Sequence, residues 1–206
     1  MSSRPAAGGG RWVGVAPERL ERWLTGFAER HGEVVADGPV LRAADGATAE
    51  VEVPFPPLTG DLVAHALADR RVGVLLVRLG GHAVGVAQGT RLVVSKVGSR
   101  QVHGRSAAGG WSQQRFARRR EGQVRVAHGA ATQTAVDVLL PHAAGLDAVV
   151  VGGERTSVEA VLADRRLAPL AALVTGRFLD VPDPRQKVLQ TVPGMLREVQ
   201  IKVTDP

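Results

Sequence analysis

The stretch VGVLLVRLGGHAVGVAQGTRLVVSKV, residues 72–97, decides the fold. It contains three apolar runs rich in Val and Leu, separated by two short turns that contain glycine. Runs of this composition with close turns predict three strands joined as a meander: Val72–Leu79, Ala83–Gln88 and Arg91–Val97. A long helical pattern follows over roughly 112–140. We therefore expect an α/β fold, a mixed α+β sheet covered by helices.

The residues before the meander predict a second group of elements. Residues 1–11 are polar and glycine-rich, and we expect a disordered leader there. Pro17 opens an amphipathic helix that Gly32 ends. Short strands separated by Asp-Gly turns follow, so residues 12–58 form an N-terminal helix and short strands. We expect one domain over 12–206.

Three further signals lie after the long helix. Ala148–Val151 is a buried type of strand that runs into Gly152-Gly153. Asp183-Pro184 is typical of a helix start, with Asp at the N-cap and Pro in the first turn. Val199–Val203 predicts a closing strand.

The composition excludes several kinds of site. The chain has 206 residues, no Cys, no Tyr, three Trp and four Phe, so the core must be aliphatic. Without Cys there are no disulfides, no thiolate metal ligands and no Cys nucleophile. The six His show no metal-ligand spacing. No apolar run approaches the roughly 20 residues of a membrane span, and the first ten residues have no secretory apolar region. We expect a soluble, cytoplasmic protein.

The positive charge is concentrated in one segment. Nine Lys and Arg lie between Arg91 and Arg125, where Glu121 is the one acidic residue. This segment carries +8, whereas the whole chain carries +6, so the other 171 residues together carry −2. Such a concentration favours a surface that binds a polyanion over a merely solvated face.

The loop after the meander joins glycines to a basic helix start. It is GSRQVHGRSAAGGWSQQRFARRR, residues 98–120. Gly109-Gly110 allows the backbone to approach a ligand closely, and Ser112 can cap a helix whose first N–H groups attract anions. Three arginines at i, i+3 and i+4 share one helix face, with a fourth beside them: Arg115, Arg118, Arg119 and Arg120. The pattern predicts phosphate binding, although it is not a Walker A loop.

The segment Gly109–Phe116, which reads GGWSQQRF, and the arginine triplet after it resemble the catalytic loop of the Vms-like release factors. The actinobacterial-type peptidyl-tRNA hydrolase branch is the most similar. The group is in turn similar to the catalytic domain of archaeal and eukaryotic class-one release factors, which carry Gly-Gly-Gln. The resemblance covers a core over 60–195 and implies an RNase H-like, release-factor-like catalytic domain. It also implies a ribosome-associated hydrolase that releases nascent chains in ribosome rescue and quality control.

The resemblance assigns roles to individual residues. Gln113 takes the catalytic position, with Gly109 and Gly110 as the loop glycines. This sequence inserts Trp111-Ser112 before the glutamine, and Gln114 is the alternative in the shifted register. The residues expected to bind RNA are Arg105, Trp111, Arg115, Arg118, Arg119 and Arg120. Trp111 either stacks on a base or packs against its own domain.

The expected partners are the large ribosomal subunit and peptidyl-tRNA, with no membrane, no metal and no cofactor. We expect a monomer. Two other functions stay open at this point. The first is an RNA endonuclease that cuts tRNA near its 3′ CCA end, and the second is a non-catalytic RNA- or ribosome-binding module.

Overall fold

The computed structural model describes residues 2–99 and 112–206, with side chains for all of them except residues 2 and 112–117. The chain forms two compact units. Unit 1 comprises Met1–Asp69 and Gly194–Pro206, and unit 2 comprises Arg70–Pro193. The single domain expected over 12–206 thus contains parts of both compact units, because the last strand of the chain (Val199–Thr204) pairs with the strand Arg11–Val15 and helps to bury a separate core.

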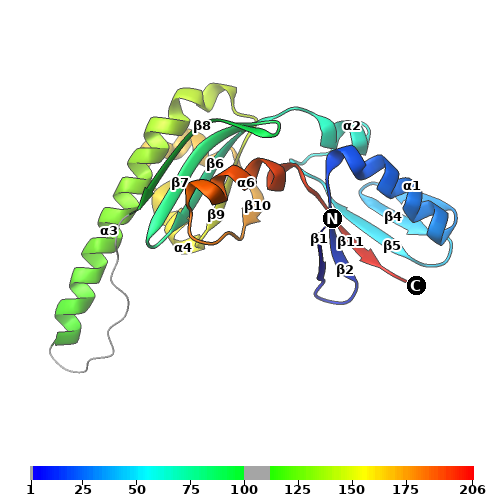
Figure 1. Ribbon diagram of the computed structural model, residues 1–206, viewed down its shortest axis with the longest axis horizontal. Coiled ribbons are helices and arrows are strands. Elements are labelled where there is room, and N and C mark those ends of the chain that lie inside the picture. The colour runs from blue at the N-terminus through cyan, green and yellow to red at the C-terminus, as the bar shows by residue number, and fades with distance from the viewer. Residues whose placement is uncertain (1, 100–111) are drawn as a thin grey trace. The chain divides into compact units, whose positions relative to one another are not determined.

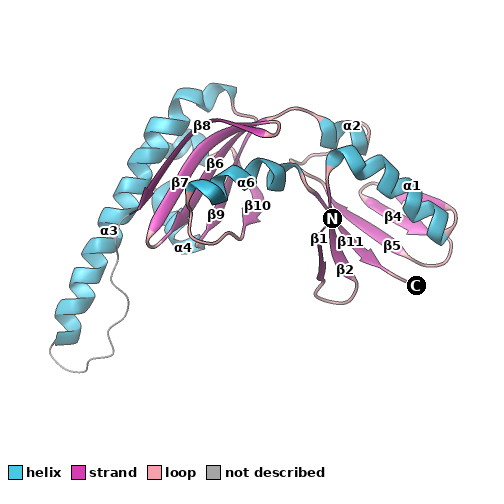
Figure 2. Cartoon of the chain, viewed as in Figure 1, coloured by secondary structure: helices cyan, strands magenta, loops and turns pink. Residues whose placement is uncertain are grey.

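Unit 1 is an antiparallel sheet with its strands in the order β1-β2-β11-β5-β4-β3 (Figures 1 and 2). The strands are β1 (Ser2–Pro5), β2 (Arg11–Val15), β3 (Val34–Asp37), β4 (Val40–Ala43), β5 (Thr48–Glu52) and β11 (Val199–Thr204). The helices are η1 (Pro17–Arg19), α1 (Leu20–His31) and α2 (Leu62–Leu67). Leu20 and Phe27 of α1 are buried against Val15, Val51 and Ile201 of the sheet. The predicted helix and short strands of this region are confirmed.

The start of the chain differs from the disordered leader expected over residues 1–11. β1 pairs antiparallel with β2, from Ser2 opposite Gly14 to Pro5 opposite Arg11. Arg4 lies over the ring of Trp12, with its guanidinium carbon 5.7 Å from the ring centroid. Backbone pairing across a glycine turn needs no apolar side chains, so a polar segment can form this strand.

Unit 2 contains a five-stranded mixed sheet in the order β10-β9-β6-β7-β8. Its strands are β6 (Arg71–Arg78), β7 (Gly81–Gln88), β8 (Arg91–Ser99), β9 (Ala148–Gly153) and β10 (Val174–Leu179). β6, β7 and β8 form the predicted antiparallel meander, and β9 and β10 add parallel strands beside β6. A meander extended by two parallel strands next to its first strand is the RNase H-like arrangement, and the expected mixed α/β fold is confirmed.

Helices cover both faces of this sheet. They are α3 (Ser112–Leu139), η2 (Leu140–Gly145), α4 (Arg155–Leu162), η3 (Arg165–Leu167), α5 (Ala168–Ala171) and α6 (Gln186–Arg197). α3, α4 and α5 bury an aliphatic cluster against one face. α6 covers the other face, where Leu189 packs against Gly85 and Gln186 Nε2 donates to Ser95 Oγ (3.3 Å). α6 begins three residues after Asp183, later than the Asp183-Pro184 pattern predicts.

The core is aliphatic, as predicted. Among the described residues, Phe27 of unit 1 is the one aromatic side chain in the buried core. In unit 2 the cluster under α3 consists of Val, Leu and Ala side chains from the strands and from the helices. None of the helices in the described part of the chain is long and apolar enough to cross a membrane.

Two glycines in α3, one in each half, allow the contribution of each half to the free energy of unfolding to be tested. Neither Gly122 nor Gly129 would place a Cβ within 4 Å of another element. Replacing a helical Gly with Ala gains about 0.5–1 kcal/mol where there is space. Gly129 lies between the buried residues Ala127 and Ala131, so Gly129→Ala should raise the free energy of unfolding, measured in urea, by about this amount.

Gly122→Ala is the matched comparison. No described residue of α3 before Ala127 is buried, so added helicity there should slow local amide exchange with little effect on global unfolding. Equal increases in the free energy of unfolding for the two variants would contradict a helix that is supported only in its second half.

Candidate nucleic-acid interface

The long helix α3 is divided into an anchored half and a projecting half. Its buried residues are Ala127, Ala131, Thr132, Thr134, Ala135, Val138 and Leu139. Among the described residues, none of 118–126 is buried. The 15 residues from Ser112 to Val126 span about 22 Å at 1.5 Å per residue. Figure 1 shows this part of the helix extending past the sheet of unit 2.

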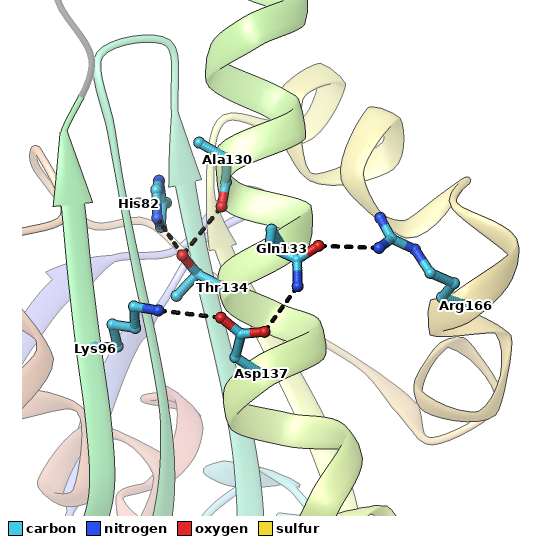
Figure 3. Close-up of polar contacts among 7 residues, drawn as sticks. All are labelled: His82, Lys96, Ala130, Gln133, Thr134, Asp137 and Arg166. Carbon is cyan, nitrogen blue, oxygen red and sulfur yellow. Dashed lines mark hydrogen bonds and ion pairs between the residues drawn. The ribbon is translucent and has the colours of Figure 1, made fainter.

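A buried hydrogen bond joins the anchored half to the middle strand of the meander. His82 of β7 is 5% exposed, and its Nε2 lies 2.9 Å from Thr134 Oγ1. The Thr134 hydroxyl donates to Ala130 O (3.0 Å), so Nε2 of His82 is the donor to Thr134 (Figure 3). A Cβ on Gly98 would lie 2.5 Å from the His82 ring. Glycine at position 98 of β8 therefore makes room for the imidazole that holds α3.

A polar chain on the surface joins the same part of α3 to a strand and to a second helical segment (Figure 3). Asp137 accepts hydrogen bonds from Gln133 Nε2 (2.7 Å) and Lys96 Nζ (3.1 Å). Gln133 Oε1 accepts from Arg166 Nη1 (3.0 Å), and Arg166 also pairs with Asp164 (3.0 Å). The hydrogen bond from Gln133, followed by that from Lys96, holds the pKa of Asp137 below its ordinary value. Hydrogen bonds from Arg166 likewise lower the pKa of Asp164.

A third contact joins α3 to α4. Ser157 Oγ donates to Glu154 Oε2 (2.7 Å) and lies 3.1 Å from His128 Nε2. Serine stands between the histidine and the carboxylate, and it is 2% exposed. A catalytic triad needs histidine in the middle and an accessible hydroxyl. These three residues therefore hold the two helices together rather than form a nucleophilic site.

The predicted catalytic residues fall at the tip of the projecting half. Gln113 and Gln114 lie in the first turn of α3, and Arg115 follows them. Their side chains lie outside the described part of the structure. The other loop residues expected to act, Arg105, Gly109, Gly110 and Trp111, also lie outside the described residues. The backbone of the glutamine pair is thus part of the first helical turn of α3.

The predicted basic residues further along α3 are described. Arg118, Arg119 and Arg125 are exposed, and Arg120 is half-buried. No carboxylate of the described residues forms an ion pair with these four. Arg118 and Arg119 follow Arg115 by three and four residues in the sequence, a spacing at which like charges repel and destabilise an isolated helix. The cations are thus uncompensated, as a phosphate-binding surface requires.

Charge is distributed unequally between the two units. Unit 2 contains 18 Lys and Arg against 8 Asp and Glu, a net charge of +10. Unit 1 contains 8 against 12, a net charge of −4. The polyanion-binding potential predicted from the sequence belongs to unit 2 alone.

Sequence reasoning missed the residues that fix α3 in place. Thr134, Gln133 and Asp137 resemble ordinary polar positions on a helix, and nothing in the sequence pairs them with His82, Lys96 and Arg166. It also missed Arg155, whose guanidinium carbon lies 4.3 Å from the ring centroid of Phe178. The one available signal for Arg155 was a cation two residues after the Gly152-Gly153 pair.

Comparison with known proteins identifies the family. The family model described as the actinobacteria/chloroflexi VLRF1 release factor matches residues 70–202, which include all of unit 2. The chain therefore belongs to this family of release factors, as its glycine–glutamine loop indicated. No curated protein matches the chain.

Two archaeal structures resemble the chain. One is the crystal structure of the archaeal translation termination factor aRF1, with 20% identity and a TM-score of 0.46, covering 62% of this chain and 36% of that one. The other is described as an archaeal protein, with 19% identity and a TM-score of 0.44, covering 59% and 32%. The chain thus spans about a third of the length of each.

The contacts of Asp137 predict a pH dependence of stability. Because its pKa is lowered on folding, its stabilising contribution is complete above the ordinary aspartate pKa of about 3.9. The contribution is lost as pH falls through the lower pKa of the folded state. Asp137→Asn should therefore be less stable than the wild type at neutral pH and equally stable at the acid end.

Urea unfolding from pH 7 to pH 2.5 measures this difference. Glu121→Gln, which removes an exposed carboxylate from the same helix, controls for the change in net charge. A stability difference between wild type and Asp137→Asn that stayed constant across this range would contradict the predicted sign.

Proposed function

We propose that this protein is a peptidyl-tRNA hydrolase that acts on the large ribosomal subunit in the cytoplasm and releases nascent chains from tRNA. The observation that supports the proposal is that Gln113 and Gln114 lie in the first turn of a helix whose first 15 residues, about 22 Å at 1.5 Å per residue, include no described buried residue. A narrow, basic projection suits a reactive centre that lies deep within RNA. Membership of a release-factor family supports the same reading.

The reaction needs a positioned water rather than a strong base. The water oxygen attacks the carbonyl carbon of the ester that joins the peptide to the tRNA 3′ end. The acyl C–O bond of the ester then breaks, and the ribose oxygen leaves with a proton from the attacking water. An amide has no useful pKa, so Gln113 is not a general base. Its carbonyl oxygen can orient the water, and a backbone N–H at the helix start can stabilise the oxyanion.

The arginines of α3 supply binding in this scheme. Arg118 and Arg119 are exposed, and neither is paired with a described carboxylate. Guanidinium groups form paired hydrogen bonds with phosphate oxygens. Such contacts position a protein on RNA without reading its sequence, so a factor that releases any nascent chain has no need of base contacts.

Replacing the glutamines tests the proposed catalytic role. Gln113→Ala should lower the rate of peptide release from stalled large subunits carrying labelled peptidyl-tRNA by roughly 10²–10³, the cost of losing one positioned group at such a site. Binding to the subunits should be unchanged, because the arginines remain. Single-turnover kinetics at saturating protein separate the two effects.

Gln114→Ala is the matched control, one residue away in the same helical turn. Full activity in Gln114→Ala together with loss in Gln113→Ala supports the assigned register. Loss in Gln114→Ala alone moves the catalytic position by one residue. Full activity in both variants would contradict the glutamine mechanism.

Binding should depend steeply on salt. Each phosphate contact contributes a slope of about −0.7 to −0.9 to a plot of log K against log salt. Replacing Arg118 and Arg119 together by Ala should reduce the slope by about two and weaken binding to large subunits. Arg22→Ala with Arg30→Ala, two exposed arginines of α1 in unit 1, is the matched control. An equal loss in the control would contradict a specific role for α3.

A further inference from the structure

The topology of unit 2 brings three helix starts to one end of its sheet. β6, β8, β9 and β10 all run in the same direction, because β7 is antiparallel to both of its neighbours and β9 and β10 are parallel to β6. The helices that follow β8, β9 and β10 therefore begin at the same end. We call this end, where β6, β8, β9 and β10 finish, the C-terminal edge of the sheet.

Three further exposed cations, in addition to those of α3, lie at the C-terminal edge. Arg155 is the first residue of α4, Arg185 directly precedes α6, and Lys187 lies in the first turn of α6. All three are exposed. The first turns of α3, α4 and α6 contain no acidic residue. Acidic side chains stabilise a helix start and cations oppose the helix dipole there, so helix stability does not explain these cations.

Three carboxylates lie at the same edge: Glu154, Asp180 and Asp183. Glu154 is held by Ser157, and Asp180 pairs with Arg78 at 3.4 Å. Asp183 lies 4.0 Å from Arg185, at the limit of an ion pair, with both side chains mostly exposed. Neither Arg155 nor Lys187 has an ion pair with a described carboxylate.

Arg155 is also held in a fixed orientation. Its guanidinium group lies over the face of Phe178, with the guanidinium carbon 4.3 Å from the ring centroid. Stacking on a ring leaves the edge N–H groups of a guanidinium able to donate hydrogen bonds, so less side-chain freedom is lost when a phosphate binds.

At the opposite end of the sheet, Asp164 accepts two hydrogen bonds from the Arg166 guanidinium and one from the Arg166 backbone N–H. The carboxylate of Asp147 accepts from the backbone N–H of Arg71 and interacts with Arg70. Arg91 and Arg165 are also exposed at this opposite end, but the basic half of α3 lies beyond the C-terminal edge, so the cations of α4 and α6 are the ones that continue the arginines of α3.

We propose that Arg155, Arg185 and Lys187 form a second RNA-binding surface that continues the arginines of α3 and binds the phosphate backbone of an RNA segment outside the reactive tRNA end. The inference rests on the proposed function in one respect, that the ligand of unit 2 is RNA. It adds a partner surface that does not touch the reacting ester. Loss of the surface should weaken binding and leave the release rate at saturation unchanged.

Binding of the full chain to large subunits carrying peptidyl-tRNA, titrated with salt, tests this surface. The double variant Arg185→Ala/Lys187→Ala should lower the salt slope by about two units and weaken binding by roughly threefold for each cation removed. Arg155→Ala should behave similarly. Arg155→Lys retains the charge without the planar stack and should lie between Arg155→Ala and wild type.

The matched control is Arg91→Ala/Arg165→Ala, two exposed arginines at the opposite end of the same sheet. Near wild-type affinity in the control, with loss at the C-terminal edge and unchanged release at saturation, supports the proposal. Equal losses in both double variants, or no loss at the C-terminal edge, would overturn it. Failure of the proposed function would look different, because wild type itself would then bind the subunits without releasing peptide.

Discussion

The packing of one half of α3 on the sheet of unit 2 is the constraint on which the rest of the site depends. Ala131, Ala135 and Leu139 are buried almost completely against the strands, and the hydrogen bond from His82 to Thr134 fixes the register of helix against sheet. Small side chains allow close approach of the helix, and the buried polar pair tolerates little displacement. The attachment of the anchored half to the sheet therefore sets the direction of the projecting half.

The like charges and the glycine of the projecting half lower its local helix stability. It contains Gly122, no described residue of it is buried, and Arg118 and Arg119 follow Arg115 at the i+3 and i+4 positions of the sequence. Like-charge pairs at this spacing cost about 0.2–0.5 kcal/mol each, and an isolated helix of this length is marginal in water. The contacts around Asp137, Gln133 and Ser157 offset this cost from the anchored end. Sequence features that oppose local stability are expected at functional sites.

The sequence predicts the elements of unit 2 well because they carry strong local signals. The meander from Val72 to Val97 consists of β-branched runs between glycine turns, and the loop motif at 109–116 is specific enough to identify the family. The pairing of the last strand, β11, with β2 near the start of the chain left no local signal, so the division into two compact units was not predicted. The contacts of His82 with Thr134 and of Arg155 with Phe178 join residues far apart in the chain, and only the tertiary fold brings them together.

The measurement that tests the central claim most directly is analysis of the tRNA 3′ end after wild-type protein has acted on stalled large subunits carrying labelled peptidyl-tRNA. Water attack on the peptidyl ester predicts a free peptide and a full-length tRNA that still ends in CCA and accepts a new amino acid. A shortened tRNA, with its 3′ fragment still attached to the peptide, would contradict the hydrolase account and assign the protein to the nucleases.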